Sequence, residues 1–238
     1  MLGAGSRVEA THSWGGYNWV RTANPFSLQL GDNVSSTWDS YLATTSSDWS
    51  VSTVLDTAIV TGITSPKTCK ATNGTVQVCS SAYGNTGWLG VAQIWLSGPH
   101  IARGTVKVND TYFNTAKYNT SAWRNLVMCQ EVGHTLGLDH QDEVFDNANL
   151  GTCMDYTNDP STNQHPNDHD YEQLVTIYTA HTDLTTTVAA ALSTPGGKGA
   201  GSSDWGRRVS GSTKPGTVAR YVKDLGNGNV VVTFVINA

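Results

Sequence analysis

The chain has 238 residues, which is enough to bury the core of one large domain or of two small ones. It carries 14 Lys and Arg against 19 Asp and Glu, a formal net charge of −5, and it has no run of basic residues, which argues against nucleic acid as a partner. No stretch approaches the roughly 20 apolar residues of a membrane span, so we expect no membrane partner either.

The first half of the chain is dominated by short apolar runs with a period of two. These runs are rich in Val, Ile, Thr and Trp, are separated by Gly, Pro and Asn, and predict strands over residues 17–21, 53–60, 75–78, 88–96 and 104–108. One helix is predicted among them, over residues 33–49, with Asp32 or Asn33 as its cap. Its apolar face is formed by Trp38, Tyr41 and Leu42.

The second half of the chain predicts two helices around a long loop. One helix begins near Thr120 and runs to Leu136, where Gly137 is placed to end it. The other spans residues 168–180. The segment between them, residues 140–167, has no periodicity, and a loop of this length in a compact domain usually serves a function.

The C-terminal part of the chain predicts a linker followed by a hairpin. Residues 193–203 are rich in Gly and Ser, which is typical of a flexible linker. Residues 218–224 and 230–236 flank a Gly-Asn-Gly-Asn turn and predict one β-hairpin. A single hairpin does not fold alone, so we expect it to dock on the main domain.

The four cysteines have the wrong spacing for a zinc knuckle, and disulfide pairing is the preferred interpretation over free thiols. Cys69 and Cys79 flank an Asn-Gly pair between two short strand-like runs, which predicts that they face each other across a hairpin. Cys129 and Cys153 each directly precede a residue of chemical interest, and a bridge between them would join two active-site segments. Two disulfides predict an oxidising compartment and hence a secreted protein.

The most informative segment is 129–140. On a helix, Gln130 and His134 lie one turn apart on the same face, with Glu131 beside them, and Gly137 allows His140 to return to His134. Three side chains that converge in this way suit one catalytic zinc ion, which takes three protein ligands and a water whose pKa it lowers toward roughly 7. Glu131 is then placed to accept the proton of that water.

This segment resembles the metzincin metalloproteases, whose signature is HExxHxxGxxH followed by a Met-turn. The residues that agree with the signature are Glu131, His134, Gly137 and His140. Cys-Met-Asp-Tyr at 153–156 looks like the Met-turn. The resemblance implies that Met154 underlies the metal site and that Tyr156 either ligates zinc or donates a hydrogen bond to the developing oxyanion.

The resemblance covers residues 12–182 and implies an α+β fold with a twisted mixed sheet, an active-site helix and a small C-terminal subdomain. We therefore expect a metzincin-like catalytic domain over 1–182, with an upper subdomain to about 137 and a lower one over 138–182. A linker over 183–210 and a hairpin extension over 211–238 follow. The segment 88–96 resembles the edge strand along which metzincins add a substrate peptide as an extra strand, although core packing explains its residues almost as well.

One departure from the signature is that Gln130 stands where the first histidine is expected. A Gln amide oxygen reaches about as far as an imidazole nitrogen but is a poorer donor to zinc. Three outcomes stay open: a centre formed by Gln130, His134 and His140; a centre formed by the two histidines with Tyr156 and water; or no bound metal. His100 and Asp139 are spare ligands.

Other candidate ligands have weaker support. Calcium ligands are available at Asp142, Glu143, Asp146 and Asn147, or within 155–170, but a solvated loop is the preferred interpretation. The remaining histidines have no ligand spacing to one another, and solvated or capping roles are expected for His12, His100, His165, His169 and His181.

The sequence therefore predicts a secreted, monomeric metalloendopeptidase that cleaves polypeptide substrates with one zinc ion and Glu131 as general base. One alternative is a catalytically impaired metzincin fold that binds a peptide or another polymer. A second alternative is a metal-dependent hydrolase that acts on esters. Serine hydrolase chemistry has little support, because the chain has no GxSxG motif.

Overall fold

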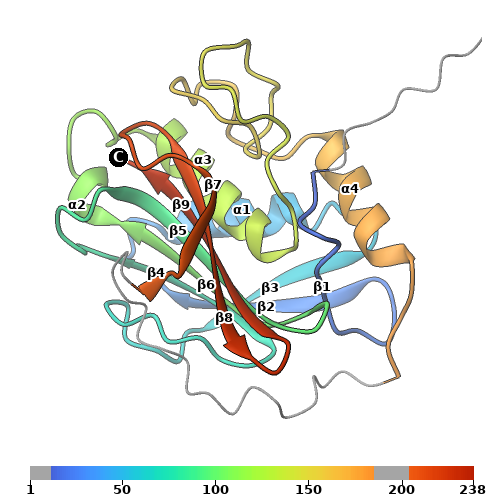
Figure 1. The fold of residues 1–238 in the computed structure, drawn as a ribbon. Coiled ribbons are helices and arrows are strands. Elements are labelled where there is room, and N and C mark those ends of the chain that lie inside the picture. Colours follow the sequence, from blue (N-terminus) through green and yellow to red (C-terminus); the bar gives the residue numbers. More distant parts are fainter. Residues whose placement is uncertain (1–11, 185–203) are drawn as a thin grey trace, which may run out of the picture.

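A computed structural model describes residues 12–184 and 204–238 (Figure 1). In these residues one large mixed sheet packs with a few helices, which confirms the α+β class. The strands are β1 (Asn18–Trp19), β2 (Phe26–Asn33), β3 (Leu55–Thr61), β4 (Thr75–Ser81), β5 (Trp88–Ser97), β6 (His100–Asn109), β7 (Arg207–Gly211), β8 (Val218–Gly226) and β9 (Asn229–Asn237). Their order across the sheet is β3-β2-β4-β6-β5-β9-β8-β7, and β1 pairs with β6.

Strand direction divides the sheet into two parts. Strands β3, β2, β4 and β6 are parallel to one another, whereas β5, β9, β8 and β7 each run antiparallel to the preceding strand in the sheet. The helices are α1 (Asp39–Trp49), α2 (Asp110–Phe113), α3 (Ser121–Thr135) and α4 (Asp168–Thr179). Helix α3 contacts β5, β6 and α1, so α1 and α3 cover one face of the sheet (Figure 1).

The start of α3 follows from the local sequence. The helix begins near Thr120, as the sequence predicts, and the hydroxyl of Thr120 accepts a hydrogen bond from the backbone N–H of Trp123 and caps the first turn. The side chains from Leu126 to Thr135 are all buried, because the sheet, α1 and the loop after α3 surround this part of the helix.

The loop predicted over 140–167 is confirmed, since it contains no helix or strand of the sheet.

Two predictions in the first half of the chain are wrong at their boundaries. The helix predicted from residue 33 begins at Asp39, and the preceding residues 26–33 form β2, which the sequence did not indicate. Strand pairing on both sides of β2, with β3 and β4, outweighs the weak local pattern. The strand predicted over 17–21 is reduced to two residues, Asn18 and Trp19.

Both predicted disulfides are present, and no described cysteine is free. Cys79 lies on β4, but Cys69 lies in an irregular loop with a φ of 47°, so the expected hairpin between them does not form. The backbone N–H of Gly74, in the predicted turn, donates a hydrogen bond to the carbonyl of Ala102 on β6. None of the helices within 12–184 and 204–238 combines the length and hydropathy of a membrane-spanning segment.

The predicted C-terminal hairpin is confirmed as β8 and β9, and it continues the main sheet (red strands in Figure 1). Strand β9 pairs with β5 along its whole length, from Asn229 to Asn237. Val232, Phe234 and Ile236 join the same hydrophobic core as α3. The linker predicted over 183–210 is wrong at its end, because β7 begins at Arg207, and residues 185–203 of that segment lie outside the described part of the chain.

Candidate metal centre

The C-terminal half of α3 and the turn after it carry the predicted site. Gln130, Glu131 and His134 lie on this helix, and all three side chains are buried. Gly137 has a φ of 100°, and a side chain here would collide with a neighbouring backbone carbonyl, so only glycine fits the turn. The turn brings His140 back to the helix, with its Nε2 3.0 Å from Nε2 of His134.

Three aromatic side chains hold the end of α3 through hydrogen bonds to carbonyl oxygens near its C-terminus. A helix leaves its last carbonyls without partners, and these donors satisfy them. The donors are Trp14, Trp19 and Tyr178, and their acceptors are the carbonyls of Leu138, Thr135 and Leu136, in that order. The backbone that carries the site is therefore anchored to β1, to the segment before it and to α4.

A backbone carbonyl determines which ring nitrogen of His134 carries the proton. Nδ1 of His134 lies 2.9 Å from the carbonyl oxygen of Leu138, which only accepts, so Nδ1 bears the hydrogen. Nδ1 of His140 faces a carboxylate oxygen of Asp139 at 3.4 Å. The other oxygen of Asp139 accepts from Nη1 of Arg220, on β8, at 3.0 Å. With its hydrogen on Nδ1, His134 has a lone pair at Nε2. Nδ1 of His140 makes no hydrogen bond within the described residues, so Nε2 of His140 either donates a hydrogen bond to that lone pair or, in the other tautomer, faces it with a second lone pair.

At 3.0 Å the two Nε2 atoms are joined either by an N–H···N hydrogen bond or by a metal ion that both lone pairs bind. Zinc at about 2.0 to 2.1 Å from each of two imidazole nitrogens in tetrahedral geometry would hold them about 3.3 to 3.4 Å apart, a few tenths of an ångström more than the separation in this structure. Burial lowers the pKa of both histidines; the neighbouring His140 lowers that of His134 further, and Asp139 only partly opposes the shift at His140. Both rings are thus neutral, the form that binds metal, and the pair fits a divalent metal ion.

The carboxyl group of Glu131 is buried with almost no hydrogen-bond donor and, in the part of the chain that the structure describes, no cation beside it. Its side chain has no exposed surface, and apart from the backbone amide of Ala92 no polar group of the described residues hydrogen-bonds its oxygens. Burial raises its pKa well above the usual range, and the amide of Ala92 opposes this only in part. A Cβ at Gly90 on β5 would lie 2.5 Å from Oε1 of Glu131, so this glycine makes room for the carboxylate.

The remaining predicted site residues surround the two histidines. Gln130 precedes His134 by one turn of α3 and is 3% exposed. The ring of Tyr156 lies 4.0 Å from that of His140, and burial raises its pKa, which keeps the phenol as a neutral donor. Met154 lies beneath α3, where a Cβ at Gly133 would come within 2.6 Å of its sulfur.

The disulfide between Cys129 and Cys153 ties α3 to the segment that contains Met154. Cys129 immediately precedes Gln130, and Cys153 immediately precedes Met154. The bridge therefore links the two parts of the chain on which the candidate centre is built. Cys69 and Cys79 are joined elsewhere, at β4, and the loop that this bridge closes contains no predicted catalytic or metal-binding residue.

Strand β9 covers the candidate centre. It occupies the edge of β5 that was predicted to receive a substrate strand. The ring of Phe234 stacks on His134, with centroids 3.9 Å apart and an interplanar angle of 6°, and it also meets Trp14 edge to face. Phe234 thus covers His134, and neither His134 nor Glu131, which lies against Gly90 of β5, has exposed surface. A substrate has no access to this carboxylate while β9 is in place.

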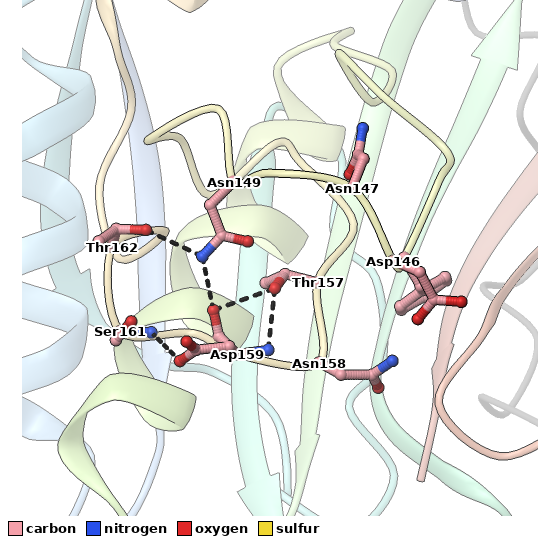
Figure 2. A pocket seen from close by; sticks show the side chains of 9 residues that line it. Asp146, Asn147, Asn149, Thr157, Asn158, Asp159, Ser161 and Thr162 are labelled. Carbon is pink, nitrogen blue, oxygen red and sulfur yellow. Dashed lines mark hydrogen bonds between the residues drawn. The ribbon is translucent and has the colours of Figure 1, made fainter.

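A polar pocket of about 430 Å³ lies in the loop between α3 and α4 (Figure 2). Asp146, Asn147, Asn149 and Asp159 line it, together with Phe145. Much of its polar lining is already paired: Asn149 donates to the carbonyl of Asp159, and the Asp159 carboxylate accepts from a backbone N–H. The ring of Phe145 stacks on that of Tyr156, so one aromatic layer connects this pocket to His140.

Several residues of the centre escaped the sequence analysis. Arg220 and Phe234 lie on strands far along the chain, and no local pattern marks them. Gly90 carried a signal, because a glycine inside a strand often marks a close approach. Asp139, expected as a spare ligand, faces Nδ1 of His140, on the opposite side of the ring from the paired Nε2 atoms.

The expectations for the other histidines are partly wrong. His12 is buried instead of solvated, and its Nε2 lies 3.1 Å from Asp170. His100, the other spare ligand, lies with His181 and Asp183 in a separate cluster. Sequence spacing gave no indication of this cluster, because its members come from β6 and from the segment after α4.

No model of a known protein family matches the chain, and no curated protein matches it either. The case for a function therefore depends on the residues themselves.

Proposed function

We propose that this chain is a secreted, monomeric, metal-dependent endopeptidase of the metzincin type, with one zinc ion held by His134 and His140. The observation that carries the proposal is the pair of Nε2 atoms 3.0 Å apart beside the uncompensated carboxylate of Glu131. Gln130 is the third protein group toward the ion. A zinc ion bound there would supply a Lewis acid that polarises the scissile carbonyl and acidifies a water.

The chain's own residues divide the remaining work. Glu131 accepts the proton of the attacking water and returns it to the leaving amine, and its raised pKa makes it a stronger base than an exposed carboxylate. Tyr156, a neutral phenol, donates a hydrogen bond to the oxyanion. Asp139 and Arg220 hold the ring of His140 in place.

The position of β9 bears on how a substrate would bind. Strand β9 pairs with β5 in antiparallel register, which is the way an extended peptide adds to a sheet edge. Its Phe234 lies on His134, at the place where a substrate residue would meet the metal. The proposal therefore includes a latent form of the enzyme, in which β9 must leave β5 before a substrate strand can bind.

The test uses the full chain with a specific cleavage site inserted between residues 193 and 203. The folded protein is loaded with zinc and assayed for hydrolysis of a labelled casein before the cut, after the cut, and after separation of the C-terminal fragment. We expect chelator-sensitive hydrolysis only once the fragment has left, and none in Glu131→Gln. Circular dichroism reports whether the remaining fragment is folded.

A second candidate is a catalytically silent fold that binds a peptide, and it is favoured by the combination of Gln130 with a β5 edge that β9 already occupies. It predicts that a folded, zinc-loaded fragment freed of β9 binds an extended peptide without cleaving it. Cleavage that disappears in Glu131→Gln rejects this candidate. Cleavage of esters but not of casein would instead assign the centre to an esterase.

A further inference from the structure

A second cluster of metal-binding side chains lies apart from the candidate centre. His100 is the first residue of β6, and His181 and Asp183 follow α4. One ligand atom of each, two imidazole nitrogens and a carboxylate oxygen, lie within 4.8 Å of one another. The cluster shares no residue with the pair His134 and His140.

The side-chain amide of Asn18 orients the ring of His100, and two hydrogen bonds fix the amide itself. The side-chain nitrogen of Asn18 donates to the carbonyl of Gly16, and its oxygen accepts from Nη1 of Arg21 at 3.0 Å. That oxygen lies 3.2 Å from Nδ1 of His100, so Nδ1 carries the hydrogen. In the neutral ring, Nε2 is therefore a lone pair, and it lies 3.4 Å from a carboxylate oxygen of Asp183.

A buried arginine holds the segment that supplies the other two side chains. Arg21 is 1% exposed, and its Nη2 donates to the carbonyls of Tyr178 and His181. Its backbone N–H donates to Oδ2 of Asp183 at 3.0 Å, and its carbonyl accepts from the N–H of the same residue. This leaves Oδ1 of Asp183 directed at His100, at 3.4 Å, and at Nε2 of His181, at 3.8 Å.

An imidazole nitrogen and a carboxylate oxygen at this distance attract each other only through a proton or a metal ion, and one oxygen of Asp183 faces a nitrogen of both imidazoles, the arrangement of ligands around one metal ion. The atom types narrow the choice: two imidazoles and one carboxylate suit a borderline ion such as zinc better than calcium or magnesium, which prefer oxygen alone. The side chains of His100, His181 and Asp183 are 21%, 46% and 17% exposed, in that order. An ion and a water molecule as its fourth ligand can therefore enter from solvent.

We propose that His100, His181 and Asp183 form a second site for a divalent transition metal, with zinc as its ion. The site joins the segment after α4 to the first residue of β6 and, through Asn18, to β1. Its role is structural, because it links the last described residues before 185 to the main sheet. The proposal does not depend on the proposed function, since the two centres have no ligand in common.

The test measures zinc binding to the full chain, purified without a histidine tag and stripped with a chelator. Isothermal titration and elemental analysis give the number of ions per chain for the wild type, His181→Ala, His134→Ala and the double variant. His165→Ala is the matched control, because His165 is also an exposed histidine beside a carboxylate, that of Asp48. His181→Ala is chosen because its side chain is the most exposed of the three.

We expect His181→Ala to lose one ion, or to bind it at least about tenfold more weakly, while His165→Ala behaves as the wild type. His134→Ala should keep the ion that His181→Ala loses. Zinc should also raise the Tm of His134→Ala but not that of the double variant. Equal stoichiometry and affinity in wild type and His181→Ala would overturn the proposal, as would loss of all zinc in His134→Ala.

Discussion

The ring of Phe234 lies flat on the ring of His134, with centroids 3.9 Å apart, although the two residues are 100 positions apart in the chain. This stacking buries one face of each ring, and the face of His134 would otherwise be open to solvent or substrate. It also places a residue of β9 directly over a proposed metal ligand. The same strand that completes the hydrophobic core therefore closes the candidate centre.

Removal of either histidine should remove the ion of the candidate centre. We expect His134→Ala and His140→Ala each to lose one zinc per chain, and Glu131→Gln to retain it, because Glu131 is assigned to proton transfer and not to metal binding. Gln130→His should tighten binding, since imidazole is a better zinc ligand than an amide oxygen. Elemental analysis and competition with a chromogenic chelator measure both effects. Retention of the same zinc content in both histidine variants would contradict the assignment.

Arg220 should influence the metal through Asp139 and His140. Arg220→Gln removes the partner of the Asp139 carboxylate, and we expect zinc affinity to fall about 10-fold to 100-fold. Arg208→Gln, an exposed arginine on neighbouring β7, is the matched control and should leave affinity unchanged. Chelator competition on both variants gives the comparison. An equal affinity for the two would show that the contact does not position His140.

Gly90 should tolerate no side chain. In Gly90→Ala the new Cβ would lie 2.5 Å from Glu131 and 2.7 Å from Val127, and we expect a loss of about 1 to 3 kcal/mol in the free energy of unfolding. Gly104→Ala, also within a strand, meets its nearest neighbour at 3.2 Å and should cost less. Chemical denaturation measures both variants. A smaller loss at Gly90 than at Gly104 would contradict the close packing described around Glu131.

The two disulfides should differ in their effect on the centre. Replacing either pair of cysteines by alanine should lower the free energy of unfolding by about 3 kcal/mol, since the bridges span 24 and 10 residues. Only the variant that lacks Cys129 and Cys153 should also bind zinc more weakly, because that bridge joins α3 to the Met154 segment. Denaturation and zinc titration on both variants separate the two effects. Equal zinc affinity in both would remove the proposed link between the bridge and the centre.

Lys107 should make the stability of the protein depend on pH. Burial lowers its pKa to about 8, from 10.5. Between pH 8 and 10.5 the unfolded chain holds more of this proton than the folded one, so the free energy of unfolding gained from this group rises with pH. Below pH 8 the buried charge lowers stability by about 3 kcal/mol.

Replacement of Lys107 isolates this contribution. Lys107→Met should be more stable than the wild type at pH 7, and its advantage should shrink as the pH rises from 8 to 10. Lys223→Met removes an exposed lysine and should show neither effect. Denaturant unfolding at several pH values measures the differences. A constant difference between Lys107→Met and the wild type would contradict the lowered pKa.

The parts of the protein that depend on local geometry could be predicted from the sequence. Helix periodicity placed Gln130, Glu131 and His134 on one helix, and the glycine at 137 indicated the turn that returns His140. The start of this helix near Thr120 and the hairpin over 218–236 follow from short-range patterns in the same way. Strand β2 was missed because its stability comes from pairing with β3 and β4, which a local pattern does not contain.

The sequence by itself determined which residues form the candidate metal centre, because the relations among positions 130, 134 and 140 are those of one helix and one turn. Only the tertiary structure decided what surrounds them. The pairing of β9 with β5, the contact of Arg220 with Asp139 and the meeting of His100 with Asp183 join residues far apart in the chain. Such contacts form because burial and strand pairing across the whole sheet lower the free energy of the fold, and no short segment encodes that sum.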